Sequence, residues 1–307
     1  MPNPDHAIIA FDGLSLAGKS TMVSMLRERS QNALVIRENV YDPLRPVTSR
    51  LNRIFKENVC SYNKGLDQLA QEYQEGSYVL ETIDEARRYA DRLELEGPDR
   101  EKRRQACLAY FFAKGRAFVN DEVRKQIMMS DVILDRWQAS GWAYQTCPAK
   151  TEEDDPYTWH NVRELNEEMG IWYPNMQIIV TCPIEQIPQR RAFRQKIGAG
   201  TAGQMSDGRE EMICNNFQEI YKWLLGRGVP TIWVENHGAP CESLEDQLRQ
   251  AIPNYLALED ELCDNIENRI IGGFDAYNLA PGSLSEKEAE QFFLQPEVLD
   301  RIYRRQV

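Results

Sequence analysis

The chain is 307 residues long and carries 48 acidic against 36 basic side chains, which gives a formal net charge of −12 at pH 7. This length is enough for a sizeable buried core, and the acidic balance speaks against a protein whose main partner is nucleic acid, because phosphate backbones are bound by an excess of Lys and Arg. The seven cysteines lie far apart without a Cys-x-x-Cys pair, and only three histidines are present, so neither a zinc site nor a disulfide framework is indicated.

The amino-terminal residues 1–6 contain no basic segment ahead of an apolar one, and no apolar run approaches the length that a membrane span needs. Widely spaced cysteines also fit thiols that are kept reduced in a cytoplasm. These features predict a cytoplasmic protein that does not enter a membrane.

Short apolar strand candidates alternate with helical stretches along most of the chain. The five candidates are 7–11, 33–36, 131–134, 177–181 and 231–234. Such alternation predicts an α/β fold, a parallel five-stranded sheet flanked by helices. Because ligands of such folds bind at the carboxyl ends of the strands, the residues that directly follow each strand are the candidates for function.

The first strand candidate leads into a phosphate-binding loop motif, Gly-x-x-x-x-Gly-Lys-Ser/Thr, at residues 13–20. The expected helix from Lys19 to about Ser30 would direct its positive end at the same anion. We expect the loop to bind ATP, with Lys19 bridging the β- and γ-phosphates and the Ser20 hydroxyl ligating Mg²⁺. The predicted ATP-binding residues are Gly13, Ala17, Gly18, Lys19, Ser20 and Thr21. A glycine-rich turn that binds nothing is the weaker interpretation, because the full motif arises rarely by chance.

A carboxylate, Glu38, follows the second strand candidate one residue after Arg37. An alcohol that accepts a phosphoryl group must lose a proton, whereas a phosphate oxygen is already anionic. Glu38 is therefore the candidate base for a hydroxyl acceptor. A pairing of Glu38 with Arg37 or Arg136 that only positions these side chains has equal weight.

Two segments fall outside the alternating plan. Residues 57–105 are charged and mostly helical in character, and they separate the second strand candidate from the helix that precedes the third. The part from about residue 256 to 307 indicates a further helical extension, with a glycine turn at residues 272–273.

The expected helix Arg103–Ile127 carries an aromatic and a basic residue, Phe112 and Arg116, four positions apart on one face. Such a pair suits a planar base through stacking and two aligned donors, although taken alone it is more often core plus surface charge. The third strand candidate is followed by Asp135 and Arg136, which can hold Mg²⁺ and bind a phosphate, respectively.

In this order, the loop, the Phe-x-x-x-Arg helix and the Asp-Arg-Trp-x-x-Ser-x-x-Ala-Tyr-Gln segment at 135–145 resemble the thymidylate kinases over roughly residues 7–252, apart from the insertion. The resemblance implies that Phe112 stacks on thymine and Arg116 bonds its carbonyl. It further implies that Arg136 contacts phosphates and that Asp135 serves the metal region. Contacts with the acceptor are also implied for Arg37, Ser140, Tyr144 and Gln145.

The basic segment 189–194, followed by glycine-rich residues 198–203, stands where this family has its mobile lid. Arg190 and Arg194 are the candidates to close over the γ-phosphate, with Arg191 not excluded. A solvated basic helix is the alternative interpretation. The resemblance thus implies a P-loop kinase domain over residues 1–255, with a helical insertion at about 57–105 and a lid at about 189–209, and a C-terminal extension over 256–307.

Two positions depart from the thymidylate kinase pattern. Ser15 stands where the family carries an aspartate in the loop, and residues 37–43 replace the Arg-Glu-Pro-Gly-Gly-Thr of bacterial members. The second segment is somewhat similar to the Glu-Pro-Val of deoxynucleoside kinases, in which the glutamate is the base. Glu38 takes that place here.

These observations lead to three hypotheses. The first is an ATP- and magnesium-dependent kinase of dTMP or a close analogue. The second is a kinase with a hydroxyl acceptor, either a deoxynucleoside or 5-hydroxymethyluracil in viral DNA, the one case with a nucleic acid partner. The third is a nucleotide-binding protein without catalysis, which the intact Lys19, Asp135 and Arg136 disfavour. A homodimer stays open.

Overall fold

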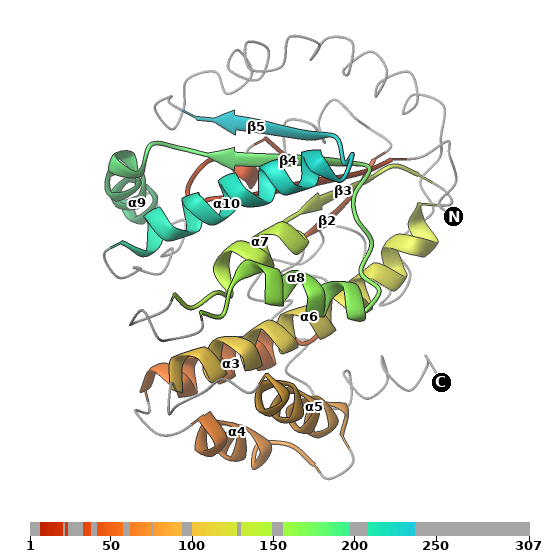
Figure 1. The fold of residues 1–307 in the computed structure, drawn as a ribbon, viewed down its shortest axis with the longest axis vertical. Coiled ribbons are helices and arrows are strands. Elements are labelled where there is room, and N and C mark those ends of the chain that lie inside the picture. Colours follow the sequence, from red (N-terminus) through yellow and green to blue (C-terminus); the bar gives the residue numbers. More distant parts are fainter. Residues whose placement is uncertain are drawn as a thin grey trace. The chain divides into compact units, whose positions relative to one another are not determined.

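A computed structural model describes residues 7–20, 22–23, 33–37, 42–57, 62–74, 77–93, 100–127, 130–148, 156–196 and 208–236 (Figure 1). The chain divides into two compact units. The first comprises 1–37, 122–143 and 173–274, and the second comprises 38–121, 144–172 and 275–307. Glu38, Thr21 and the predicted extension 256–307 lie outside the described residues, so the expectations for them stay predictions.

The first unit contains a parallel sheet of five strands in the order β2-β3-β1-β4-β5. The strands are β1 (Ile8–Gly13), β2 (Leu34–Arg37), β3 (Val132–Asp135), β4 (Met176–Thr181) and β5 (Thr231–Glu235). The α/β fold class predicted from the sequence is confirmed. Every residue of β1 is buried, as a central strand covered on both faces requires. Phe11 and Arg37 both pair with Asp135, so β1, β2 and β3 end at the same edge.

Helices of the first unit follow the carboxyl ends of the strands. A short 3-10 turn, η1 (Ile184–Gln186), and α9 (Ile187–Lys196) come after β4, and α10 (Arg209–Gly226) packs on β4 and β5 (Figure 1). The buried side chains of α10 recur at spacings of four, three and four, from Ile213 to Leu224. Helix α7 (Gln138–Tyr144) begins directly behind β3, and its Trp142 packs edge-on against Trp223 of α10, with ring centroids 5.7 Å apart.

The described part of the second unit is mostly helical, with one antiparallel bridge between Cys147 and Tyr157. It contains α3 (Arg45–Glu57), α4 (Tyr62–Ala70), α5 (Tyr78–Arg92), α8 (Trp159–Glu168) and most of α6 (Arg100–Gln126), whose last residues belong to the first unit. Helix α4 packs on both α3 and α5. The described part of the insertion expected at 57–105 is therefore mostly helical, and α6 begins three residues before the expected Arg103.

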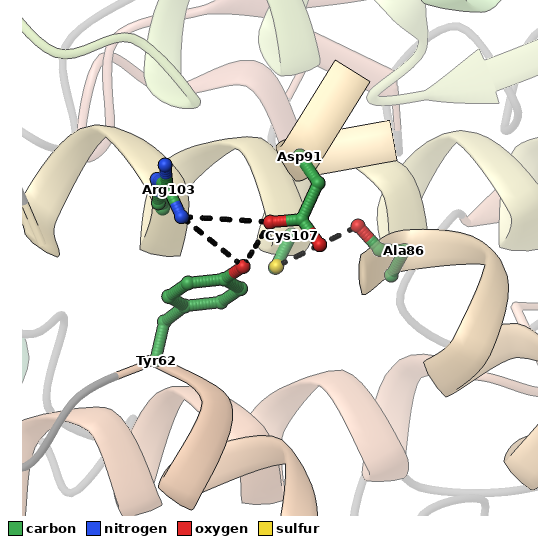
Figure 2. Close-up of polar contacts among 5 residues, drawn as sticks. All are labelled: Tyr62, Ala86, Asp91, Arg103 and Cys107. Atoms are coloured by element: carbon green, nitrogen blue, oxygen red, sulfur yellow. Dashed lines mark hydrogen bonds and ion pairs between the residues drawn. The ribbon is translucent and has the colours of Figure 1, made fainter. Parts of the chain in front are cut away.

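A polar cluster joins α4, α5 and α6 within the insertion (Figure 2). The Tyr62 hydroxyl donates to Asp91, and Arg103 lies 3.4 Å from the Tyr62 oxygen and 3.5 Å from an Asp91 oxygen. Cys107 beside them donates to the Ala86 carbonyl, and burial raises the pKa of this thiol to about 12. Cys107 is thus a neutral packing residue at physiological pH.

None of the helices in the described part of the chain is long and apolar enough to cross a membrane.

Candidate phosphate-binding site

The loop between β1 and Lys19 curls through left-handed backbone conformations. Gly13 has φ +133°, Leu16 +67° and Gly18 +101°. A Cβ on Gly13 would lie 1.9 Å from the Val180 carbonyl oxygen, and the next amide, that of Leu14, donates to this oxygen at 3.0 Å. Only glycine fits at position 13, and the loop is anchored to β4. Alternating conformations of this kind turn successive amides toward one side, where they can hold an anion.

Lys19 lies inside this loop, with 4% of its surface exposed. Its Nζ donates to the carbonyls of Gly13 at 3.0 Å and Leu14 at 2.5 Å. Burial lowers the pKa of Lys19 well below its ordinary value, and the Arg136 guanidinium adds to this shift, while Asp135 and Asp12 oppose it. Two cations that disfavour each other's charge make a position where a bound phosphate is strongly favoured.

Ser20 and Asp135, both predicted to serve a metal ion, lie together. The Ser20 hydroxyl donates to Asp135 Oδ2 at 3.1 Å, and Arg37 Nε lies 3.9 Å from the same oxygen. Oxygen donors of this type suit Mg²⁺, which keeps several waters and phosphate oxygens in its shell. The described residues contain no cluster of three or more His, Cys, Asp or Glu that could hold a metal ion. One hydroxyl and one carboxylate, completed by water and nucleotide oxygens, are the donor set that fits Mg²⁺ here.

Arg136 follows Asp135 in a left-handed conformation, with φ +73°. Its amide donates to the Phe11 carbonyl at 2.9 Å. The backbone therefore leaves β3 in a sharp turn beside the phosphate loop, and the Arg136 side chain is half-buried.

Arg190 of α9 contacts the backbone of the phosphate loop. It donates to the Leu16 carbonyl at 3.2 Å, to the Asn236 carbonyl at 2.7 Å and to Gln186 Oε1 at 2.9 Å. Asn236, directly after β5, donates from Nδ2 to the Ala17 carbonyl at 2.8 Å. Two successive carbonyls of the loop are therefore held from behind. A polar residue directly after the fifth strand was the signal that could have identified Asn236.

The other predicted lid residues are in different surroundings. Arg191 pairs with Glu210 of α10 at 3.1 Å, and nothing is described of the Arg194 side chain. The roles proposed for Arg190 and Arg194 at the γ-phosphate stay predictions.

The second unit brings Phe112 and Arg116 together on α6, as their spacing predicted. The Arg116 guanidinium carbon lies 5.8 Å from the centre of the Phe112 ring, and that of Arg45 lies 5.1 Å from it. Arg116 is 2% exposed and lies 3.4 Å from Asn166 Oδ1 on α8. Arg45 and Asn166 were missed by the sequence analysis, because neither falls in a motif.

The remaining predicted acceptor residues follow Arg136. Ser140 is buried, and its hydroxyl has no hydrogen-bond partner in the described part of the chain. Tyr144 and Gln145 are half-buried and belong to the second unit.

No protein-family model and no curated protein sequence matches the chain. Among solved structures it is similar to a thymidylate kinase from Candida albicans, with 14% identity and a TM-score of 0.48 over 84% of this chain and 93% of that one. It is also similar to a thymidylate kinase from Ehrlichia chaffeensis, with 15% identity and a TM-score of 0.40 over 83% of this chain and 100% of that one.

Proposed function

We propose that this chain is an ATP- and magnesium-dependent phosphotransferase that acts on a thymidine-like pyrimidine deoxynucleotide, dTMP or a close analogue. The observation that carries the proposal is the buried Lys19 cation inside the left-handed loop, with the Ser20–Asp135 pair at the end of the neighbouring strand. This arrangement supplies loop amides and a cation for the β- and γ-phosphates.

Each residue of the first unit has a distinct task in the transfer. Lys19 moves from the loop carbonyls to the phosphates when ATP binds. Ser20 and Asp135 would hold Mg²⁺, which would neutralise phosphate charge. Arg136 binds the transferred or the acceptor phosphate. Phosphoryl transfer needs little covalent chemistry from the protein, so this positioning of charge is its main contribution.

The acceptor preference rests on the second unit. Phe112 offers a half-buried ring for stacking, and Arg116, fixed by Asn166, offers donors for a base carbonyl. A pyrimidine with a carbonyl group suits this pair. The predicted cytoplasmic location also stays a prediction.

A hydroxyl acceptor is the second candidate, favoured by the register of β2. Arg37, the last residue of β2, pairs with Asp135, and Glu38 is the next residue in the sequence. A carboxylate there could accept the proton that an alcohol loses. The acceptor would then be a deoxynucleoside or 5-hydroxymethyluracil in viral DNA.

The test is transfer of labelled phosphate from ATP with Mg²⁺ to dTMP, thymidine, 5-hydroxymethyl-deoxyuridine and DNA that contains this base. We expect transfer to dTMP and its loss in Lys19→Ala. A Lys19→Ala protein with full turnover would contradict the proposal, and no transfer to any acceptor would leave a nucleotide-binding protein without catalysis.

Glu38→Gln separates the two candidates, because it should abolish transfer to a hydroxyl but only weaken transfer to a phosphate.

A further inference from the structure

Asp12 is a fully buried carboxylate at the end of β1, one residue before the phosphate loop. Its Oδ1 accepts the backbone amides of Trp137 at 2.8 Å and Ser140 at 3.0 Å. Its Oδ2 accepts Gln177 Nε2 from the neighbouring strand β4 at 3.1 Å. Both oxygens of this buried charge are therefore used, and all three donors are neutral.

The two amides that Asp12 accepts belong to the start of α7. Trp137 immediately precedes this helix and Ser140 is its third residue, so both amides are among those that a helix start leaves without an intrahelical partner. Most helices satisfy such amides with a polar residue at their own first position. In α7 this position holds Trp137, whose indole is not a hydrogen-bond acceptor, and the Asp12 carboxylate of β1 accepts the amides instead. A negative charge at a helix start is also favoured by the helix dipole.

The turn that precedes α7 has an energetically unfavourable backbone conformation. Arg136 is left-handed, which a residue with a side chain adopts only where its surroundings hold it. The Phe11 carbonyl holds the Arg136 amide, and the carboxylate of the next residue, Asp12, holds the Trp137 amide. Consecutive residues of β1 therefore fix consecutive peptide groups on either side of Arg136.

We infer that Asp12 is a positioning residue for phosphoryl transfer, which clamps the Asp135–Arg136 turn in its left-handed form and thereby sets both side chains against the phosphate loop. Asp12 immediately precedes Gly13, the first residue of the phosphate loop, so the clamp connects this loop directly to the Asp135–Arg136 turn. An asparagine would keep one acceptor oxygen but would direct an amide group at the amide of Gln177. The role in transfer rests on the proposed function, whereas the clamp rests on the hydrogen bonds alone.

A matched residue at the other end of the strands separates this role from a general contribution to folding. Asp131 Oδ1 accepts the Ala7 amide at 2.7 Å, so it is a second buried aspartate that holds a backbone amide, at the opposite end of the same pair of strands. Asp131→Asn makes the same chemical change far from the turn. Both variants are expected to lower the melting temperature.

The first experiment compares kinetics in Asp12→Asn and Asp131→Asn. We expect Asp12→Asn to lower kcat by about tenfold or more, because Asp135 and Arg136 lose their alignment, while the dissociation constant for ATP changes less than about threefold. Asp131→Asn should keep kcat within about twofold of the original protein. Retention of kcat by Asp12→Asn, or an equal loss in both variants, would overturn the inference.

The second experiment needs no activity. Arg136→Gly and Arg136→Ala both remove the side chain, but only glycine adopts the left-handed conformation without cost. With Asp12 present, the glycine variant should melt several degrees higher than the alanine variant. With Asp12→Asn, this difference should shrink, because an amide oxygen holds the Trp137 and Ser140 amides less firmly than a carboxylate oxygen does. An unchanged difference would disprove the clamp. A chain that transfers phosphate to no acceptor would disprove the proposed function and leave this result standing.

Discussion

The charge of Lys19 favours ligand binding but destabilises the folded protein when no ligand is bound. Its ammonium is buried among loop carbonyls, and burial, followed by Arg136, lowers its pKa well below 10.5. Between the lowered pKa and 10.5, the unfolded chain binds a proton that the folded chain has lost, so the free energy of unfolding rises with pH over this window.

The nucleotide-free protein should therefore gain stability relative to Lys19→Met as the pH rises toward 10.5. At pH values below the lowered pKa, the lysine is charged in both the folded and the unfolded chain. The difference in the free energy of unfolding between the two proteins is then constant. Urea unfolding of both proteins at a series of pH values from 7 to about 10 measures this. Two parallel stability curves would show that Lys19 titrates with an ordinary pKa.

Two glutamines of the first unit are nearly identical in burial but differ in hydrogen bonding. Gln138, 1% exposed, has no partner for either amide atom among the described residues. Gln177, 0% exposed, donates from Nε2 to the Ala10 carbonyl at 3.0 Å and to Asp12, while its Oε1 has no partner among the described residues. A buried polar group without a partner costs about 1–3 kcal/mol, whereas a bonded one contributes to stability.

Methionine at these two positions should thus act in opposite directions. Gln138→Met is expected to raise the melting temperature by a few degrees, because it removes an unsatisfied amide with little change in shape, and Gln177→Met is expected to lower it. Thermal unfolding followed by circular dichroism compares them. A Gln138→Met protein that melts below the original would contradict the first expectation.

At the scale of elements, the phosphate loop is held by parts of the chain that are distant in sequence. Leu16 and Ala17 turn their carbonyls toward Arg190 of α9 and Asn236 after β5, across 174 and 219 positions. Because a loop amide and the preceding carbonyl belong to one peptide plane, fixing a carbonyl on one side fixes the amide on the other. Helix α9 and the residue that follows β5 therefore share in shaping the phosphate loop.

Asn236→Ala should weaken ATP binding by about tenfold, because the Ala17 carbonyl loses its partner and the loop amides lose a fixed direction. The matched control is Thr181→Val, which removes a buried hydroxyl that bonds the Val234 carbonyl at 3.4 Å without touching the loop. Calorimetric titration with ATP should show the original affinity for Thr181→Val. Equal losses in both variants would point to a general effect on the sheet.

Local signals were sufficient to predict the sheet and the loop. The apolar run at 7–11 and the glycine spacing after it predict β1 and its turn, and β1 extends only two residues further, to Gly13. The helix with Phe112 and Arg116 was likewise predicted from spacing within a few residues. Asp12, Asn166 and Asn236 were missed, because each acquires its role from a partner 50 to 219 positions away. The position of Asn236 directly after β5 marks it as a candidate, but no periodicity or motif encodes the partner of any of these three residues.

For the whole molecule, each of the two compact units contains the residues proposed to bind one of the two substrates. The phosphate loop, Asp135 and Arg136 belong to the first unit, and Phe112 and Arg116 belong to the second. With a net charge of −12, the molecule as a whole repels nucleotides, so each binding event depends on these local cations. The two substrates should therefore protect different segments of the chain.

Hydrogen–deuterium exchange tests this division. A non-hydrolysable ATP analogue with Mg²⁺ is expected to slow exchange at residues 13–20 and 135–140, because loop amides that bind phosphates are withdrawn from water. dTMP alone should slow exchange around Phe112 on α6 and leave 13–20 unchanged. Lys19→Ala should lose the first effect and keep the second. Protection of α6 by the ATP analogue alone would show that the helix with Phe112 serves the donor nucleotide, and the acceptor would then need another site.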